Sequence, residues 1–140
     1  MTPSQIAAVQ SSFAQVVPIK DQAAALFYER LFTIDPPTRV LFKGDVAEQG
    51  KKLMAALAMV VAGLKDLPAM LPAVRNMARR HAGYGVEDRH YDTVGQALLW
   101  TLEQGLGPNF TPEVRDAWTA AYTALATVMM ESAKDARAAA

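Results

Sequence analysis

The sequence predicts an all-α protein, and three observations lead to that prediction. Apolar residues recur at intervals of three and four along most of the chain, as they do on one face of a helix. Residues that start and stop helices separate these stretches. No segment shows convincing alternation between apolar and polar side chains over four or more residues, the pattern of a half-buried strand. We expect a single domain over residues 1–140, a length that allows a real hydrophobic core.

The first two predicted helices are separated by a proline. The first helix begins with Thr2 as its N-cap, Pro3 at the first helical position and Gln5 closing a capping box. Pro18 interrupts the helical pattern, since a proline removes a backbone donor from the helix interior. The second helix is expected from about residue 20 to about residue 34.

Turn-forming residues surround the third long helix on both sides. The segment 35–38 contains two prolines, so it ends the second helix and begins a short turn or helix. A corner over residues 40–45 follows and ends at Lys43-Gly44-Asp45. A helix is then expected from about residue 46 to about residue 64, with a break over residues 66–68.

Three further helices complete the prediction. One runs from about residue 69 to about residue 82 and stops at a glycine pair, Gly83 and Gly85. The next runs from about residue 88 to about residue 106. Thr111 caps the last helix, which continues past Met129. Six substantial helices of uneven length, with one or two short ones, disfavour a simple four-helix bundle.

Composition and charge exclude several classes of protein. Fourteen basic residues balance 14 acidic ones, which argues against a nucleic-acid-binding protein because such proteins usually carry a basic face. Hydrophobic residues make up 51% of the chain and charged residues 20%, so the chain is not disordered. No apolar run approaches the roughly 20 residues that span a bilayer, and residues 1–5 lack signal-peptide features. We therefore expect a cytoplasmic protein without a membrane span.

Histidine is scarce and cysteine is absent, so the candidates for a soft or borderline metal ligand are almost reduced to His81 and His90. A lone histidine cannot hold a bare zinc ion, which needs about three or four protein ligands. It can hold haem iron, because the porphyrin supplies the equatorial nitrogens and the protein adds one axial ligand. The alternative is that His81 only caps the C-terminus of its helix, where a partly cationic imidazole suits the dipole.

Five stretches carry a resemblance to a known family over nearly the whole chain. Tyr28 lies in Leu26-Phe27-Tyr28-Glu29-Arg30-Leu31-Phe32, Phe42 in Val40-Leu41-Phe42-Lys43, and His81 in Arg79-Arg80-His81. Two more are His90-Tyr91-Asp92-Thr93-Val94-Gly95 and Asp116-Ala117-Trp118-Thr119-Ala120-Ala121-Tyr122. In this order they resemble the globin family, and most of all single-domain bacterial haemoglobins and the haem domain of flavohaemoglobins. The stretch 105–112 is also similar to neuroglobins. The resemblance implies a globin fold of about seven or eight helices around haem b.

The resemblance implies a role for His81 as the iron ligand. Its Nε2 would bind iron, while its Nδ1–H would donate to the carbonyl of Met77, four residues earlier. Phe42 is similar to the corner phenylalanine that stacks on the porphyrin, and its alternative is an ordinary core aromatic residue. His90 is expected not to bind iron. The implied haem contacts are Phe42, Lys52, Leu53, Met77, Arg80, His81, Val86, Tyr91 and Val94, with Lys52 and Arg80 as partners of the propionates or, alternatively, solvated charges.

The resemblance also implies a polar pair on the gas-binding side. Tyr28 matches the distal tyrosine and Gln49 the distal polar residue, although a shift of one position would present Glu48 or Gly50 instead. Leu53 would form the apolar wall beside the gas, because residues four apart share a helix face. Hydrogen bonds to a charged acceptor contribute about 1.5–3 kcal/mol each, so two donors imply tight binding of dioxygen. Whether Tyr28 or Gln49 approaches ferric iron stays open.

The chain departs from flavohaemoglobins in two respects. These proteins continue into flavin- and nicotinamide-binding domains, so turnover here would require a separate reductase. They also carry a glutamate near the proximal histidine, where a gap-free alignment places Ala133, with Glu131 about 200° around the helix. The absence of that glutamate disfavours peroxidase-like chemistry. No histidine precedes His81, which disfavours the two-histidine iron of neuroglobins.

The implied function is tight, reversible binding of dioxygen and of other diatomic gases, including nitric oxide and carbon monoxide. The expected roles are oxygen scavenging or sensing, or the oxidation of nitric oxide to nitrate; tight binding disfavours simple oxygen delivery. An alternative from a different class is a haem-free helical interaction or regulatory module. Tyr28, Phe42 and His81 together argue against this alternative.

Overall fold

The computed structural model describes residues 1–42, 45–83 and 86–139, and of residues 82, 83, 133 and 135–139 it describes only the backbone. This part of the chain forms six α-helices and four 3₁₀-helices and contains no strand. In chain order they are α1 (Pro3–Val16), η1 (Val17–Ile19), α2 (Lys20–Ile34), η2 (Pro36–Leu41), α3 (Val46–Ala62), η3 (Leu64–Asp66), α4 (Leu67–Gly83), α5 (Asp88–Leu106), η4 (Gly107–Asn109) and α6 (Pro112–Ala139). The all-α prediction is confirmed.

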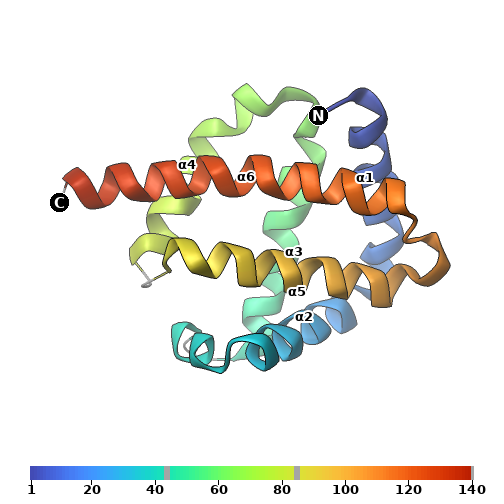
Figure 1. Ribbon diagram of the computed structural model, residues 1–140, viewed down its shortest axis with the longest axis horizontal. Coiled ribbons are helices and arrows are strands. Elements are labelled where there is room, and N and C mark those ends of the chain that lie inside the picture. Colours follow the sequence, from blue (N-terminus) through green and yellow to red (C-terminus); the bar gives the residue numbers. More distant parts are fainter. Residues whose placement is uncertain (43–44, 84–85, 140) are drawn as a thin grey trace.

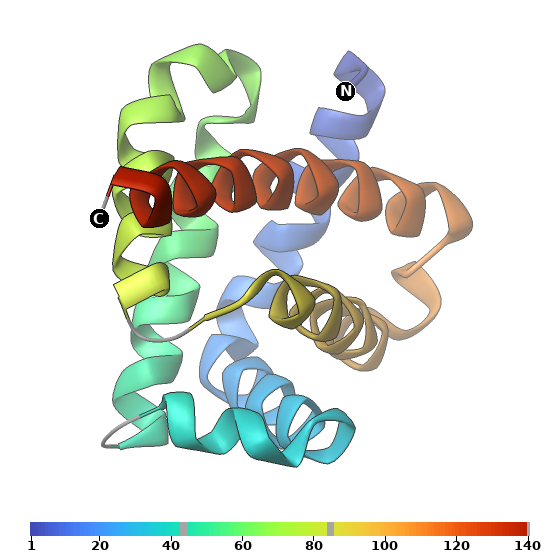
Figure 2. The same cartoon turned by 60° about the vertical axis from the view of Figure 1, so that its left-hand side comes forward.

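The helices cross one another in layers. In Figure 1, α5 and α6 lie together in front of α1, α3 and α4, which run across them, and α2 lies beneath α5. The most extensive packing joins α4 to α6, α2 to α5, α1 to α6 and α2 to α3. The turned view in Figure 2 shows α6 passing over α4 and α3. Although α3 and α4 follow one another in the chain, they do not pack extensively on each other.

Two helix starts predicted from local chemistry, at Thr2 and Thr111, are confirmed. Thr2 caps α1, and its hydroxyl accepts a hydrogen bond from the Gln5 amide while the Gln5 side chain accepts one from the Thr2 amide. Thr111 accepts from the Val114 amide at 3.3 Å and so caps α6. Gly107, with φ of 55°, turns the chain at the end of α5, a conformation that costs glycine little.

The junction between α3 and α4 differs from the prediction. We expected one helix to reach about residue 64 and the next to begin at about residue 69, but α3 ends at Ala62 and α4 begins at Leu67. Pro68 therefore lies in the first turn of α4 rather than in a break, because the backbone amides there need no helical partner. The predicted seven or eight helices become six α-helices among the described residues, with 3₁₀-helices in place of the short ones.

A buried polar contact joins the two ends of the chain. Trp118 on α6 donates its indole N–H to the Ser12 hydroxyl on α1 at 2.8 Å, and both side chains are buried. The rings of Phe13 and Trp118 lie 6.2 Å apart in the same region. A buried indole N–H without an acceptor would be costly, so Ser12 lets α6 bury its tryptophan against α1.

Two helix crossings depend on glycine. A Cβ added to Gly50 on α3 would lie 2.9 Å from the Cβ of Ala24 on α2, closer than real Cβ atoms approach. A Cβ on Gly95 of α5 would lie 2.9 Å from the ring of Tyr122 on α6. The α2–α3 crossing is the tighter constraint, because Ala24 has no flexible end that can move aside.

The structure offers no helix suited to a membrane span within the part that it describes. No single helix there is both long and apolar enough to cross a bilayer. A bent pair, Val46–Ala62 and Leu64–His81, meets the requirement by length and composition only when its two arms, inclined at 53°, are taken together.

We expect Gly50→Ala to destabilise the protein by about 1–2 kcal/mol, because overpacking of the α2–α3 crossing exceeds the gain in helix propensity. The free energy of unfolding in urea measures this effect. Gly105→Ala is the matched control, since its new Cβ would meet only the flexible end of Ile19 at 3.3 Å. Equal stability of the two variants would contradict the close crossing, and Ala24→Gly should partly restore Gly50→Ala.

Candidate functional site

An aromatic cluster forms where the end of α2 meets the corner that follows η2. Tyr28 is buried, and its ring meets the Phe42 ring edge-on with centroids 5.2 Å apart. Phe32 stacks on Tyr28 at 6.0 Å and contacts Phe42 at 5.8 Å. Because edge-on and offset contacts suit aromatic rings, these three side chains hold one another in defined orientations. Tyr28 and Phe42 are among the site residues expected from the sequence, whereas Phe32 is not.

The hydroxyl of Tyr28 reaches across to α3. It donates a hydrogen bond to the backbone carbonyl of Gln49 at 3.2 Å. Burial raises the pKa of the Tyr28 hydroxyl to about 12, so the group is a neutral hydrogen-bond donor at physiological pH. The close crossing at Gly50 and Ala24 lets this bond form between the two helices.

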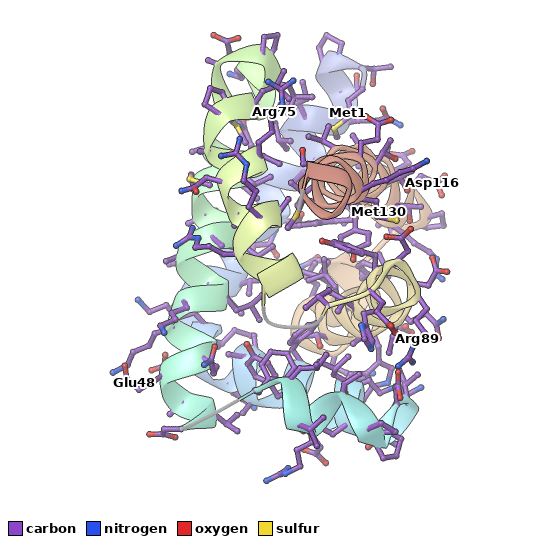
Figure 3. The ribbon with its side chains drawn as sticks, turned by 90° about the vertical axis from the view of Figure 1, so that its left-hand side faces the viewer. Met1, Glu48, Arg75, Arg89, Asp116 and Met130 are labelled. Carbon is purple, nitrogen blue, oxygen red and sulfur yellow. The ribbon has the colours of Figure 1, made fainter. Side chains whose placement is uncertain are left out.

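The three positions considered for the distal polar residue differ in their surroundings. Glu48 is exposed, points outward from α3 (Figure 3) and pairs with Lys51 at 3.3 Å. Gly50 is buried against Ala24 on α2. Gln49 lies between them, half-buried, with its carbonyl bonded to Tyr28. Leu53, one turn further on, is half-buried and lines a small apolar cavity together with Phe27 and other core residues.

His81 lies on the last turns of α4 and is half-buried. Its Nδ1 is 2.7 Å from the Met77 carbonyl, the acceptor expected from the sequence. A carbonyl only accepts hydrogen bonds, so Nδ1 carries the proton and Nε2 is the nitrogen with a lone pair. Met77 is buried and belongs to the core. The chain leaves the helix in a turn in which the Val86 amide donates to the His81 carbonyl at 3.1 Å.

Tyr91 and Val94, two of the haem contacts expected from the sequence, lie on α5. Tyr91 is buried, and its backbone carbonyl accepts a hydrogen bond from the Tyr122 hydroxyl of α6 at 2.6 Å. Burial, and then the proximity of Tyr91 and Asp92, raise the pKa of Tyr122. Val86 and Val94 are half-buried and pack against the core. Tyr122 therefore holds the start of α5 against α6.

The remaining predicted positions lie at the surface or outside the described side chains. Lys52 and Arg80 are exposed, and neither forms an ion pair within the part of the chain that is described. His90 is buried near the start of α5, and its Nδ1 accepts a hydrogen bond from the Glu87 amide at 2.8 Å. The side chain of Ala133, and with it the comparison with the flavohaemoglobin glutamate, lies outside the described residues.

One polar connection near the site was not predicted. Arg89 pairs with Glu87 beside it and with Asp35 at the end of α2, which is 54 residues away in the sequence. No helical periodicity links residues so far apart, so the sequence contains no local signal for this contact.

The donor set fits one axial position rather than a chelated ion. Among the residues whose placement is described, no cluster of three or more His, Asp or Glu side chains can hold a metal ion. His81 instead offers one imidazole nitrogen with its tautomer set by Met77. The partly exposed apolar side chains of Phe42, Leu53 and Val94 are the kind of surface that a flat apolar ring covers. These features suit a haem held through one histidine.

Comparison with known proteins identifies the family of the chain. Residues 25–129 match the Globin family. The chain belongs to the globin family. This membership confirms the resemblance recognised in the sequence and implies that the protein binds haem.

Curated relatives of this globin include flavohaemoproteins of Vibrio cholerae and Bordetella parapertussis. They are 33% and 35% identical to it over 108 and 118 residues, or 75% and 80% of the chain. The aligned regions make up 27% and 29% of those two proteins, so the globin spans less than a third of their length.

A solved structure with the same fold is an engineered carbene transferase described as a putative nitric oxide dioxygenase from Rhodothermus marinus. It is 27% identical, superposes with a TM-score of 0.90, and the match covers 99% of this chain and 97% of the other. The globin fold predicted from the sequence is thereby confirmed.

The raised pKa of Tyr28 predicts a loss of stability in alkaline solution. The folded-state pKa of about 12 lies above the ordinary value of 10.0, so the folded protein keeps this proton longer than the unfolded chain does. Below about pH 10 the group leaves stability unchanged, and between about pH 10 and pH 12 stability falls by up to about 2 kcal/mol.

The free energy of unfolding measured across this pH range, compared between the unaltered protein and Tyr28→Phe, checks the expectation. The variant should lose less stability between about pH 10 and pH 12, because it has no hydroxyl at position 28 to ionise. Identical pH dependence in both proteins would show that the Tyr28 hydroxyl ionises as easily as an exposed phenol.

Proposed function

We propose that this globin holds haem b through His81, binds dioxygen tightly and oxidises nitric oxide to nitrate with electrons from a reductase. The buried hydroxyl of Tyr28 carries the proposal, because it supplies a neutral donor on the gas-binding side. The identity to flavohaemoproteins and the fold of a putative nitric oxide dioxygenase support it. Oxygen scavenging or sensing would use the same gas-binding site without nitric oxide.

On the proximal side, His81 would supply Nε2 to the iron. The Nδ1–H bond to Met77 fixes the ring orientation and raises the basicity of Nε2. Tyr91, Val86 and Val94 would contact the porphyrin from the turn after His81 and from α5. Phe42 would stack on the ring, held in place by its contacts with Tyr28 and Phe32.

On the distal side, the phenol of Tyr28 and the amide of Gln49 would donate hydrogen bonds to the gas, and Leu53 would exclude water beside it. The burial of Tyr28 favours this role, because a donor shielded from water interacts more strongly with a charged acceptor. Haem, when bound, would give dioxygen more negative charge than it gives carbon monoxide. The two donors would therefore favour dioxygen.

The exposed cations Lys52 and Arg80 would pair with the two propionates. Both lie on helices that bear other proposed haem contacts, Lys52 beside Leu53 on α3 and Arg80 beside His81 on α4. Because both side chains are exposed, each pair would contribute at most about 1 kcal/mol.

Bound haem would supply the iron that binds dioxygen and the electron that the reaction consumes. One nitric oxide and one dioxygen combine to form one nitrate, whose negative charge comes from that electron. A one-electron donor would replace that electron, and a flavoprotein reductase is the class of protein that fits. The globin contributes a dry site and hydrogen-bond donors that retain dioxygen until nitric oxide arrives.

We expect His81→Gly to abolish the Soret band of the haem-loaded protein, because the variant lacks the imidazole proposed as the axial ligand. Absorption spectra before and after addition of haemin measure this, and exogenous imidazole should restore the band. His90→Gln is the matched control and should keep it. If the unaltered protein acquires no Soret band with haemin, the haem-binding proposal is wrong and a haem-free interaction module becomes the better account.

Tyr28→Phe should release dioxygen roughly tenfold faster, since a bond to a charged acceptor contributes about 1.5–3 kcal/mol and part of that is offset by the lost bond to Gln49. Rapid displacement of dioxygen by carbon monoxide measures the release rate. Carbon monoxide release should change less. An unchanged dioxygen rate would exclude Tyr28 as a distal donor.

The unaltered protein and Tyr28→Phe also allow the reaction with nitric oxide to be tested. Rapid mixing of the dioxygen-loaded form with nitric oxide should yield one nitrate per haem and the ferric protein. Adding a flavoprotein reductase with its nicotinamide donor should then give repeated turnover. Tight dioxygen binding without nitrate formation would instead favour scavenging or sensing.

A further inference from the structure

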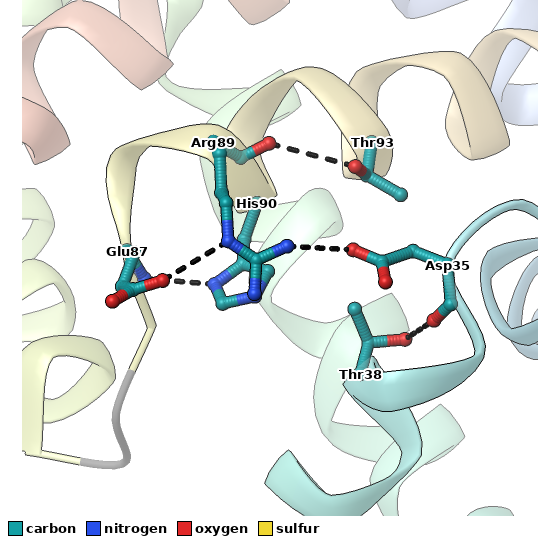
Figure 4. Close-up of polar contacts among 6 residues, drawn as sticks. All are labelled: Asp35, Thr38, Glu87, Arg89, His90 and Thr93. Carbon is teal, nitrogen blue, oxygen red and sulfur yellow. Dashed lines mark hydrogen bonds and ion pairs between the residues drawn. The ribbon is translucent and has the colours of Figure 1, made fainter.

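The guanidinium of Arg89 joins two parts of the chain that are far apart in sequence (Figure 4). Its Nη1 donates to Asp35 Oδ2 at 3.1 Å, and its Nε donates to Glu87 Oε2 at 3.0 Å. Asp35 caps the C-terminus of α2, whereas Arg89 lies in the first turn of α5. Arg89 therefore bridges the end of α2 to the start of α5.

Both segments joined by Arg89 are fixed locally by buried side chains. The Thr38 hydroxyl, itself buried, donates to the Asp35 carbonyl at 2.7 Å. On the other side, the buried ring of His90 accepts from the Glu87 amide at 2.8 Å. Forming an ion pair between two segments that are already ordered costs less conformational entropy than forming one between mobile side chains. More of the attraction therefore remains to hold the two segments together.

The two carboxylates bound by Arg89 differ in exposure, and the difference shows which of the two ion pairs is the stronger. The Asp35 side chain is 16% exposed, whereas the Glu87 side chain is 61% exposed and the Arg89 side chain 60%. Water and salt screen the pair with Glu87, which also lies only two residues away in the same turn. The pair with Asp35 is more shielded and connects separate elements, so it is the effective contact.

The location of the bridge relates it to the site. Asp35 lies on the connection between Tyr28 and Phe42, the residues proposed for the distal side and the corner. Arg89 lies on the connection between His81 and Tyr91, proposed for the proximal side. Separation of these two connections would widen the site, and the Arg89–Asp35 pair opposes that separation.

We propose that the Arg89–Asp35 pair is a clasp that retains haem in this globin. The inference rests on the proposed function, because it takes the two connections as the walls of a haem site. Arg89 is a positioning residue: it holds the walls together and leaves the iron chemistry to His81 and Tyr28. Its forked guanidinium lets one side chain hold Asp35 while Glu87 keeps the fork oriented.

The test is the rate at which haemin passes from the ferric globin to an excess of apomyoglobin. We expect Arg89→Gln to lose haemin about two- to fivefold faster, the factor that an ion pair of up to about 1 kcal/mol contributes. Arg89→Lys should lose haemin at a rate between those of the unaltered protein and Arg89→Gln, since an ammonium group keeps the charge but cannot reproduce the forked guanidinium. Arg115→Gln removes an exposed arginine of α6 and should lose haemin at the unaltered rate.

A double-mutant cycle with Asp35→Asn separates the clasp from general stability. If the pair is the clasp, Asp35→Asn alone should match Arg89→Gln, and the double variant should be no faster than either. Additive effects in the cycle would overturn the proposal. The proposal would also be overturned if the variants without haem unfolded at lower urea concentrations while the rate of haemin loss stayed unchanged.

The outcome also distinguishes this proposal from the one on which it rests. An unaltered protein that takes up no haemin overturns the proposed function and the clasp with it. Stable haemin uptake with equal loss rates in the unaltered protein, Arg89→Gln and Asp35→Asn overturns the clasp alone.

Discussion

The close crossing of α2 and α3 is the constraint on which the distal side depends. Gly50 has no side chain, so the backbone of α3 approaches Ala24 to a distance that a Cβ would forbid. At that separation the Tyr28 hydroxyl reaches the Gln49 carbonyl, and Tyr28 in turn orients Phe42 and Phe32. A residue that lacks a side chain thus determines where three aromatic rings and a buried donor lie.

The proximal side is built differently, from hydrogen bonds to main-chain carbonyls. Met77 sets the tautomer of His81, and Tyr122 holds the backbone of Tyr91 through its carbonyl. Helices α3 and α4 pack mainly on other helices rather than on each other, so the two sides are supported independently. The Asp35–Arg89 ion pair is one of the contacts that connect α2, which bears Tyr28 of the distal side, to α5, which bears Tyr91 of the proximal side.

Much of the fold could be predicted because helix ends are decided locally. Thr2 and Thr111 are caps with a proline directly after them, and both begin helices as expected. The predicted position of Pro68 was wrong because a proline can either end a helix or lie in the first turn of the next one. The local sequence does not distinguish these two cases. The fold family followed from Tyr28, Phe42 and His81 in order. The Asp35–Arg89 pair could not be predicted, since it depends on how α2 and α5 pack.

The bond between Tyr28 and Gln49 also bears on which gases the site would favour. A hydroxyl donates one proton, so Tyr28 cannot bond the Gln49 carbonyl and a gas molecule together. The net gain on gas binding is therefore a difference between a bond of about 1.5–3 kcal/mol to a charged acceptor and one of about 0.5–1.5 kcal/mol to a neutral carbonyl. A gas that gains little charge has almost no advantage over the carbonyl, whereas dioxygen does. The contact that joins α2 to α3 would therefore lower the gain with dioxygen, and it cannot widen the preference for dioxygen over carbon monoxide beyond what a donor without a competing acceptor would give, because the bond to the carbonyl is lost whichever gas takes the hydroxyl.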